Sequence, residues 1–273
     1  MSISLSACIE PFSSRWHLAI NSRKSRRQYD LCRPIPPDIL LKLRSACADF
    51  RPFPSVRVSL VTESSEGVFK GAVGPYGKVK DAPAFVAFIG NMADPHVQEK
   101  VGYTGEGIVL EATALGLATC WVGVFFRAET VAPLVGLEPD ERVLAVTPIG
   151  YAQTNKTLEE KLMTGFVQAR QRKHLSSLTA GMEEEQWPRW IKASLEAARL
   201  APSAVNRQPW SFFIEPGRIT VSVRTGGPDF GISKRLDCGI AMLHIEVGAL
   251  ACGAKGEWHF LKAPQVARFS ALA

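Results

Sequence analysis

Two long apolar segments, far apart in the chain, constrain the fold more than any other feature of this sequence. They read GIVLEATALGLATC at residues 107–120 and GIAMLHIEVGALAC at residues 239–252, and each contains a single glutamate. A helix that is apolar on most of its surface must be buried on most sides, so each segment predicts a central helix. The two segments match in the same order at Gly107-Ile108, Gly116 and Cys120 against Gly239-Ile240, Gly248 and Cys252. Because such matches recur in the same order in both halves, they predict an internal duplication. Two buried helices of this kind can pack across a pseudo-two-fold interface, as identical subunits do in a symmetric dimer.

Shorter patterns around these helices predict the remaining elements of two similar halves. In the first half, periodicity predicts one helix and three strands, at residues 36–50, then 55–63, 81–90 and 143–151. In the second half, it predicts a helix and two strands, at residues 187–201, then 210–215 and 218–224. The expected fold class is α+β, with two similar lobes that each pack a β-sheet against helices.

A polar and charged stretch, residues 152–185, separates the two halves. It includes Arg170, Arg172 and Lys173, and cations in such mixed segments usually form a solvated face. We interpret the stretch as a helix and a connector. The expected domains are a first lobe at residues 1–155, a connector at 156–185 and a shorter second lobe at 186–273.

Bulk composition argues against several classes of protein. The chain has 273 residues, of which 46% are hydrophobic, and a formal charge of +6, which allows an anionic ligand but gives little support to a nucleic-acid partner. The six cysteines and five histidines are scattered and form no CxxC pair, which argues against a metal site or a disulfide framework. No apolar run reaches the roughly 18 residues needed to span a bilayer. We expect a cytoplasmic protein with no membrane partner.

The stretch SRKSRRQYD, at residues 22–30, gathers four cations around one hydroxyl group. Arg23, Lys24, Arg26 and Arg27 surround Ser25. Arginine offers a fork of charged donors that suits phosphate oxygens, and the serine hydroxyl adds another donor. The alternative is a basic turn exposed to solvent, which is the usual place of a charge cluster. The residues of this stretch leave both interpretations open.

The stretch APSAVNRQPW, at residues 201–210, follows a predicted helix and leads into a predicted strand. Its short polar residues, Ser203 and Asn206, can present side chains or bond their own backbone in a tight loop. Loops held on a rigid scaffold are the usual places where ligands bind. A helix stop with turn capping is the alternative, and it leaves the polarity of the loop between two apolar elements unexplained.

Taken together, three motifs resemble the nitroreductase-like FMN flavoproteins. They are RxSxR at 23–27, GLxTCWVG at 116–123 and PSxxNxQPW at 202–210, and Pro148-Ile149-Gly150-Tyr151 is similar to the last core strand of that family. Ordinary members are homodimers in which RxSxR of one subunit meets PSxxN of the other at each of two FMN sites. Here RxSxR occurs only in the first half and PSxxN only in the second. The resemblance therefore implies a fused, two-lobed and monomeric pseudo-dimer with one FMN site.

The resemblance, which covers about residues 22–260, also implies which residues bind the flavin. The implied set is Arg23, Lys24, Ser25, Arg27, Lys78, Val122, Gly123, Pro202, Ser203 and Asn206. Arg23 and Ser25 would hold the phosphate and ribityl end, with Lys24 contributing mainly backbone. Arg27 and Lys78 would lie toward the pyrimidine side of the ring.

The other members of the implied set would approach from different directions. The backbone at Val122 and Gly123 would face the ring edge near N5, whereas Pro202, Ser203 and Asn206 would come from the second lobe. In this family a basic residue after the last strand often helps to hold the phosphate. Lys156 and Lys161 are both candidates, and the sequence does not decide between them.

The implied activity is that of an FMN-dependent NAD(P)H oxidoreductase. NAD(P)H would reduce the flavin at N5, and an electron-poor small molecule of the nitroaromatic or quinone type would accept the electrons. Such chemistry belongs to the cofactor and needs no protein nucleophile, so no catalytic side chain is expected. The alternative is a non-catalytic flavin-binding or flavin-handling protein, because one half has lost its own site.

Overall fold

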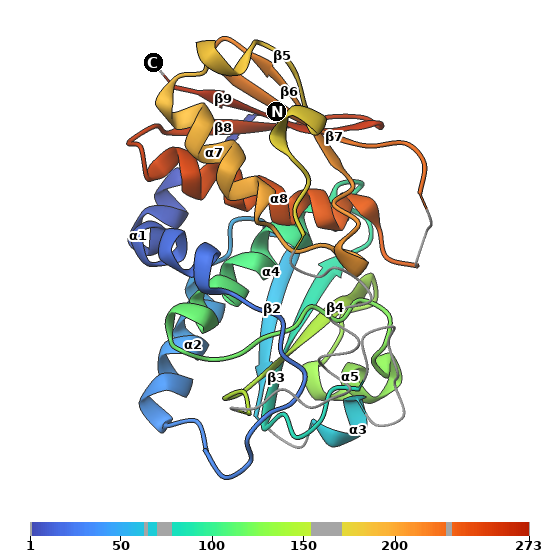
Figure 1. Ribbon diagram of the computed structural model, residues 1–273. Helices are drawn as coiled ribbons and strands as arrows, with labels where there is room; N and C mark the ends of the chain where they lie inside the picture. Colours follow the sequence, from blue (N-terminus) through green and yellow to red (C-terminus); the bar gives the residue numbers. More distant parts are fainter. Residues whose placement is uncertain (1, 63–64, 70–77, 154–170, 228–230, 273) are drawn as a thin grey trace.

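The computed structural model describes residues 2–62, 65–69, 78–153, 171–227 and 231–272. These residues form a three-stranded sheet and a six-stranded sheet, with helices packed between them (Figure 1). The predicted class, a mixed fold of sheets flanked by helices, is confirmed. None of the helices in these ranges is both long and apolar enough to cross a membrane.

The first sheet has the order β2-β3-β4 and is antiparallel throughout. Its strands are β2 (Val56–Val61), β3 (Ala84–Asn91) and β4 (Glu141–Ile149), which confirms three predicted strands. Strand β3 is buried at seven of its eight positions because both of its faces are covered. Helix α2 (Pro37–Asp49), also predicted, packs against β2, whereas α3 (Glu66–Phe69) and α5 (Ala128–Val135) contact each other and belong to a second, smaller core.

The second sheet has the order β1-β8-β9-β7-β6-β5. Its strands are β1 (Ser2–Ser4), β5 (Thr179–Gly181), β6 (Trp210–Glu215), β7 (Arg218–Val223), β8 (Gly256–Phe260) and β9 (Gln265–Ala271). The sequence predicted β6 and β7 correctly, but it did not predict the other four. Strand β1 comes from the first residues of the chain and β5 from the expected connector, so this sheet is built from segments far apart in the sequence. The proposed domain limits stay a prediction.

Helix α1 (Ser6–Ser22) was not predicted, and it ends directly before Arg23. Its buried face includes Ile9, Trp16 and Ile20. The indole of Trp16 donates a hydrogen bond of 2.7 Å to the buried carboxylate of Glu111. The helix packs against α4 and α8, and this contact fixes the point where the basic stretch begins.

The central helices are α4 (Val97–Ala114) and α8 (Lys234–Leu250). Both begin earlier than the apolar pattern predicted, and residues 116–120 are not helical, so the predicted helix at 107–120 was wrong in its limits. Gly116, at φ +79°, ends α4, and the amide of Leu117 bonds back to the carbonyl of Ala112 at 2.9 Å. This arrangement is a glycine-terminated helix cap. Helix α7 (Arg189–Arg199) packs along α8.

The two central helices are related by a shift of 137 residues, from Val97 to Lys234. Under the same shift, Gly116 corresponds to Gly253, which also has a positive φ, of +77°, and Trp121 corresponds to Trp258. The matched apolar segments suggested a different register, with Gly107 opposite Gly239, which the helix starts and caps contradict.

The contact between α4 and α8 is reciprocal under this shift. A Cβ on Gly102 would stand 2.0 Å from the carbonyl oxygen of Leu236, and one on Gly239 would stand 1.9 Å from that of Glu99. Glycine at both positions is therefore what lets the two backbones touch. Such an exchange of equivalent contacts is the geometry of a two-fold interface.

Candidate functional site

The basic stretch after α1 lies beside the GLATCWVG motif. Ser25 forms a parallel bridge with Thr119, and the amide of Arg26 donates a 2.9 Å hydrogen bond to the carbonyl of Thr119. The chain then runs past Lys80, which pairs with Gln28. Two motifs that are about a hundred residues apart in the sequence are thus neighbours.

Arg23 places its charge in the interior of the protein. Its side chain is only 7% exposed, and its Nε lies 3.9 Å from Oε1 of the fully buried Glu106. Nη1 donates to Ser25 Oγ at 3.4 Å, while Nε has no hydrogen-bond partner among the described residues. Buried donors usually have partners. A guanidinium with spare donors in this position suits the oxygens of a bound anion.

The loop after α7 has a strained backbone. Val205, Asn206 and Gln208 have φ values of +46°, +54° and +47°, a region that residues other than glycine rarely adopt. Ser203 supports the loop, because its Oγ accepts a 2.9 Å hydrogen bond from the amide of Gln208. Strain of this kind persists only where surrounding contacts impose it, and it is common at ligand sites.

A buried ion pair ties this loop to the start of α8. The carboxylate of Asp237 accepts hydrogen bonds from the amide of Ala204 at 3.1 Å and from Arg207 Nε at 2.7 Å. Arg207 also donates to the carbonyl of Ile232 at 2.8 Å. Burial raises the pKa of Asp237 to about 6, although the charge of Arg207 opposes this rise.

Arg172 is the site residue that the sequence did not reveal. Its Nη1 donates a 2.9 Å hydrogen bond to Asn206 Oδ1, and its Nη2 donates to the carbonyl of Leu200 at 3.3 Å. Burial, together with the charges of Arg23 and Arg199, lowers the pKa of Arg172 to about 10. Arg23 is therefore near enough to Arg172 for their like charges to repel each other.

The prediction that the cations of residues 152–185 form a solvated face is therefore wrong for Arg172 and Lys173. Lys173 Nζ donates to the carbonyls of Arg207 and Gln208 at 2.9 and 3.1 Å, and its own amide donates to Gln208 Oε1 at 2.9 Å. Nothing in the local pattern distinguished Arg172 and Lys173 from solvated cations, because their partners come from a loop more than thirty residues away. Arg170, Lys156 and Lys161 lie outside the described residues.

The end of the GLATCWVG motif also reaches the second half. Val122 pairs with Val146 through two hydrogen bonds of 2.9 Å, which fixes the backbone of this turn against β4. A Cβ on Gly123 would stand 2.9 Å from the side chain of Ile232, the residue whose carbonyl binds Arg207. The turn at Val122 and Gly123 therefore lies against the segment that anchors the strained loop.

The remaining predicted site residues are Pro202, Arg27, Lys24 and Lys78. Pro202 is buried, Arg27 is half-buried, and the carbonyl of Arg27 accepts a 2.9 Å hydrogen bond from the amide of Lys80. Lys24 and Lys78 are exposed, and neither side chain has a hydrogen bond or an ion pair with another described residue. No three histidine, cysteine, aspartate or glutamate side chains come close enough to hold a metal ion in the described part of the chain.

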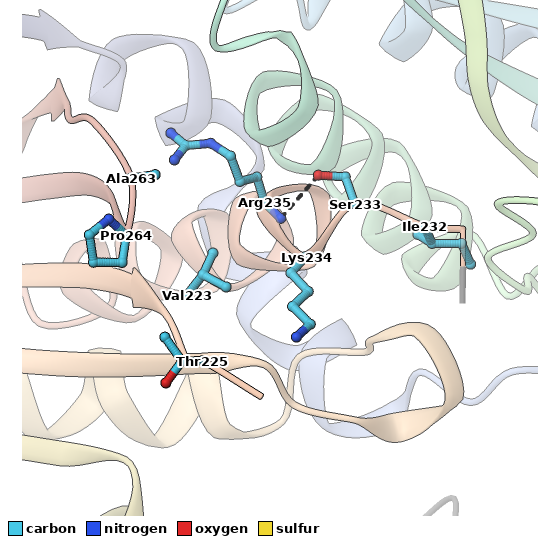
Figure 2. Close-up of a pocket in the computed structure, with 8 residues that line it drawn as sticks. All are labelled: Val223, Thr225, Ile232, Ser233, Lys234, Arg235, Ala263 and Pro264. Atoms are coloured by element: carbon cyan, nitrogen blue, oxygen red, sulfur yellow. Dashed lines mark hydrogen bonds between the residues drawn. The ribbon is translucent and has the colours of Figure 1, made fainter. Parts of the chain in front are cut away.

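A separate hollow of about 470 Å³ lies at the N-terminus of α8 (Figure 2). Its lining includes Ile232 and Ser233, and Figure 2 shows Lys234 and Arg235 pointing in different directions from the helix. Both cations already have partners, because Lys234 donates to the carbonyl of Gly226 and Arg235 to the carboxylate of Glu99. Of the two cations at this hollow, Arg235 is thus neutralised by a carboxylate, and Lys234 is held by a backbone carbonyl.

The arrangement between the halves can bind an anion such as a phosphate ester. It combines the buried guanidinium of Arg23, the hydroxyl of Ser25 and the Arg172–Asn206 pair. The spare Nε of Arg23 is a donor that a phosphate oxygen would satisfy. The residues present thus fit the phosphate end of a flavin mononucleotide.

Comparisons with known proteins identify the family of the chain. Residues 17–249 match a protein-family model described as "Putative TM nitroreductase". A crystal structure of a "putative nitroreductase" from Thermotoga maritima covers 93% of both chains with a TM-score of 0.58 and 22% identity, which shows a shared fold. No curated protein matches the chain.

Smaller proteins of known structure match part of the chain. A nitroreductase family protein from Clostridium novyi covers 51% of this chain and 86% of its own, with 20% identity and a TM-score of 0.43. A nitroreductase with bound FMN from Bacteroides fragilis covers 52% and 91%, with 20% identity and a TM-score of 0.40. The family model covers most of the sequence. The chain belongs to the nitroreductase family that this model describes and is an oxidoreductase.

Proposed function

We propose that the protein is an FMN-dependent NAD(P)H oxidoreductase with a single flavin site between its two halves. One observation carries the proposal. The buried cation Arg23 of the first half lies within electrostatic range of Arg172, which is bonded to Asn206 of the second half. A bound anion would offset the repulsion between these two cations.

The residues at the site would have distinct roles. Arg23, Ser25 and Arg172 would bind the phosphate, and Asn206 would orient Arg172 through their hydrogen bond. Pro202 and Ser203 would form the wall on the side of the strained loop.

The remaining members of the set surround the ring. The backbone at Val122 and Gly123 would lie at the ring edge, while Arg27 and Lys78 would bring positive charge toward its pyrimidine side and Lys24 would contribute backbone. When bound, FMN supplies hydride and electron transfer between NAD(P)H and an electron-poor acceptor of the nitroaromatic or quinone type. The protein would bind and orient both partners without a catalytic side chain of its own.

The same proposal includes the origin and organisation of the chain. We infer a duplication with lobes at residues 1–155 and 186–273, a connector at 156–185, and a pseudo-dimer that acts as a monomer in the cytoplasm. The reciprocal contacts of Gly102 and Gly239 support it, as does the equivalence of the caps at Gly116 and Gly253. The proposed substrate is a small molecule.

The test is the flavin content of the purified protein, measured from its visible spectrum and from flavin released per chain. The expected result is one FMN per chain, with NAD(P)H oxidation that depends on an added quinone or nitroaromatic. Arg23→Ala, Arg172→Ala and Asn206→Ala should each lose flavin, whereas Arg51→Ala, which removes an exposed arginine, should keep it.

Other results would change the proposal in defined ways. Two FMN per chain would contradict the single site. Full occupancy without reduction by NADH or NADPH would favour a flavin-handling protein. A chain that neither contains FMN nor takes it up would refute the flavin site itself.

A further inference from the structure

A buried histidine lies at the crossing of the central helices, where the two halves meet. His244 of α8 and Glu106 of α4 are both fully buried, and their Nε2 and Oε1 atoms are 3.0 Å apart. On its other side, His244 Nδ1 lies 2.8 Å from the carbonyl oxygen of Ala197 in α7. The imidazole therefore bridges three helices through two short polar contacts.

These contacts determine how many protons the pair holds. A carbonyl oxygen can only accept a hydrogen bond, so Nδ1 of His244 carries a proton. The 3.0 Å contact between Nε2 and Glu106 Oε1 then needs a second proton, either on the imidazole or on the carboxyl group. In both cases the histidine and the glutamate together hold one more proton than a neutral histidine beside a carboxylate. The pair as a whole is therefore neutral.

The neutral pair is the immediate neighbour of Arg23. Oε1 of Glu106, the atom that faces His244, lies 3.9 Å from Arg23 Nε, and Oε2 accepts a 2.7 Å hydrogen bond from Trp121. If His244 did not contribute the extra proton, Glu106 would be a bare counter-ion for Arg23 and would cancel its charge. With that proton in place, Arg23 keeps a net positive charge that can attract an anion.

Other charged groups near these helices have their own partners. On α8, the carboxyl group of Glu246 accepts from Tyr103 and Trp258. On α4, Glu99 is paired with Arg235. Arg172, whose charge interacts with that of Arg23, has the same sign. Hence Glu106 is the carboxylate that decides the net charge next to Arg23.

We propose that His244 is a positioning residue that sets the charge of the anion site, because the proton it shares with Glu106 leaves Arg23 free to bind a phosphate group. The proposal rests on the FMN site described above and adds a role for a residue of the second half that does not touch the ligand. It applies to any ligand with a phosphate group and has no effect on an uncharged ring.

Two flavins and two substitutions test the proposal on the full chain. FMN and riboflavin, which lacks the phosphate, are titrated into flavin-free protein at pH 7.5, and binding is followed by flavin fluorescence. His244→Gln keeps a side-chain donor near Glu106 but cannot supply the extra proton, so Glu106 becomes a bare carboxylate. Glu106→Gln removes the carboxylate charge and serves as the matched control.

The expected effects differ between the ligands and between the variants. His244→Gln should weaken FMN binding about tenfold or more and change riboflavin binding less than about threefold. Glu106→Gln should stay within about threefold of wild type, and the double variant should recover FMN binding to a similar level. His244→Asn, whose amide nitrogen replaces Nδ1, is a second variant that lacks the proton and should behave as His244→Gln does.

Three results would overturn the proposal. The first is wild-type FMN binding by both His244→Gln and His244→Asn. The second is an equal weakening of both flavins, which indicates a structural role. The third is a double variant that does not recover FMN binding. If the wild-type chain binds no FMN, the proposed function fails first. The charge argument is then tested with inorganic phosphate, which should raise the melting temperature of wild type and of Glu106→Gln but not of His244→Gln.

Discussion

The close backbone contact between α4 and α8 gives a sharp prediction about stability. Gly102 and Gly239 face carbonyl oxygens of the opposite central helix, at 2.0 and 1.9 Å from the position of an added Cβ. Packed Cβ atoms keep at least 3.0 Å from such neighbours, so an alanine at either position must separate α4 from α8 by about 1 Å. The carbonyl groups belong to helix backbone and cannot rotate away.

Two opposing effects determine the size of the loss. Alanine is favoured over glycine inside a helix by about 1 kcal/mol, whereas overpacking of a core typically costs about 1–3 kcal/mol and more where backbone must move. Because this clash is with backbone, we expect Gly102→Ala and Gly239→Ala each to destabilise the fold by at least about 2 kcal/mol. In a chain of this size, that lowers the melting temperature by roughly 5 °C.

The assay is urea denaturation followed by circular dichroism. Gly67→Ala, in α3, is the control, because its added Cβ would meet only a methyl group of Thr130 at 3.3 Å and its stability should change by less than about 1 kcal/mol. The double variant at 102 and 239 should lose less than the sum of the single losses, since one separation of the helices relieves both clashes. Single variants as stable as wild type, or a strictly additive double variant, would refute the reasoning.

Three further predictions concern protonation and backbone conformation. Burial raises the pKa of Glu246 to about 7 from its ordinary value of 4.5. Its contribution to stability is therefore complete below pH 4.5 and is lost as the pH rises through 7, by up to about 3 kcal/mol. Urea denaturation at pH 5 and 8 should show this loss in wild type and a smaller loss in Glu246→Gln. Gly116→Ala and Gly253→Ala meet no atom within 4 Å, so each should lose about 1–2 kcal/mol through the positive φ alone, and a thermal melt with no loss would contradict this. Because the pKa of Asp237 is about 6, the residue is ionised at pH 8 and anchors the strained loop through Arg207. Asp237→Asn should therefore weaken FMN binding at pH 8 but differ little from wild type at pH 5. An equal effect at both pH values would argue against this anchor.

Sequence patterns predicted the elements whose burial follows a simple period. Helix α2 and strands β2, β3, β6 and β7 were predicted nearly within their limits. The first half of α4 was missed because it contains Gly102, Gly105 and charged residues, which normally argue against a buried helix. In the structure the glycines allow close contacts and Glu99 is paired with Arg235, so tertiary packing overrides both local signals.

The candidate site was predictable only where its residues form motifs. Arg23, Ser25 and Asn206 stand in recognisable stretches, and the structure brings them toward a common place through Arg172. Arg172 itself has no local signal, because its role comes from a loop that follows it by more than thirty residues. The same is true of His244, which looks like an isolated polar residue in an apolar helix until α4 is placed against it.

The pairing of β1 with β8 has a consequence for how the chain is made. The register joins Ser2 to His259, so β1 cannot pair with β8 until the chain has been made as far as residue 259. The first sheet lies within residues 56–149 and can close once they are made, whereas the second sheet stays open until β8 and β9 have been made. During that interval the apolar face of α1, including Trp16, has no α8 to cover it. The nascent chain should therefore depend most on chaperones in the interval before α8 and β8 have been made.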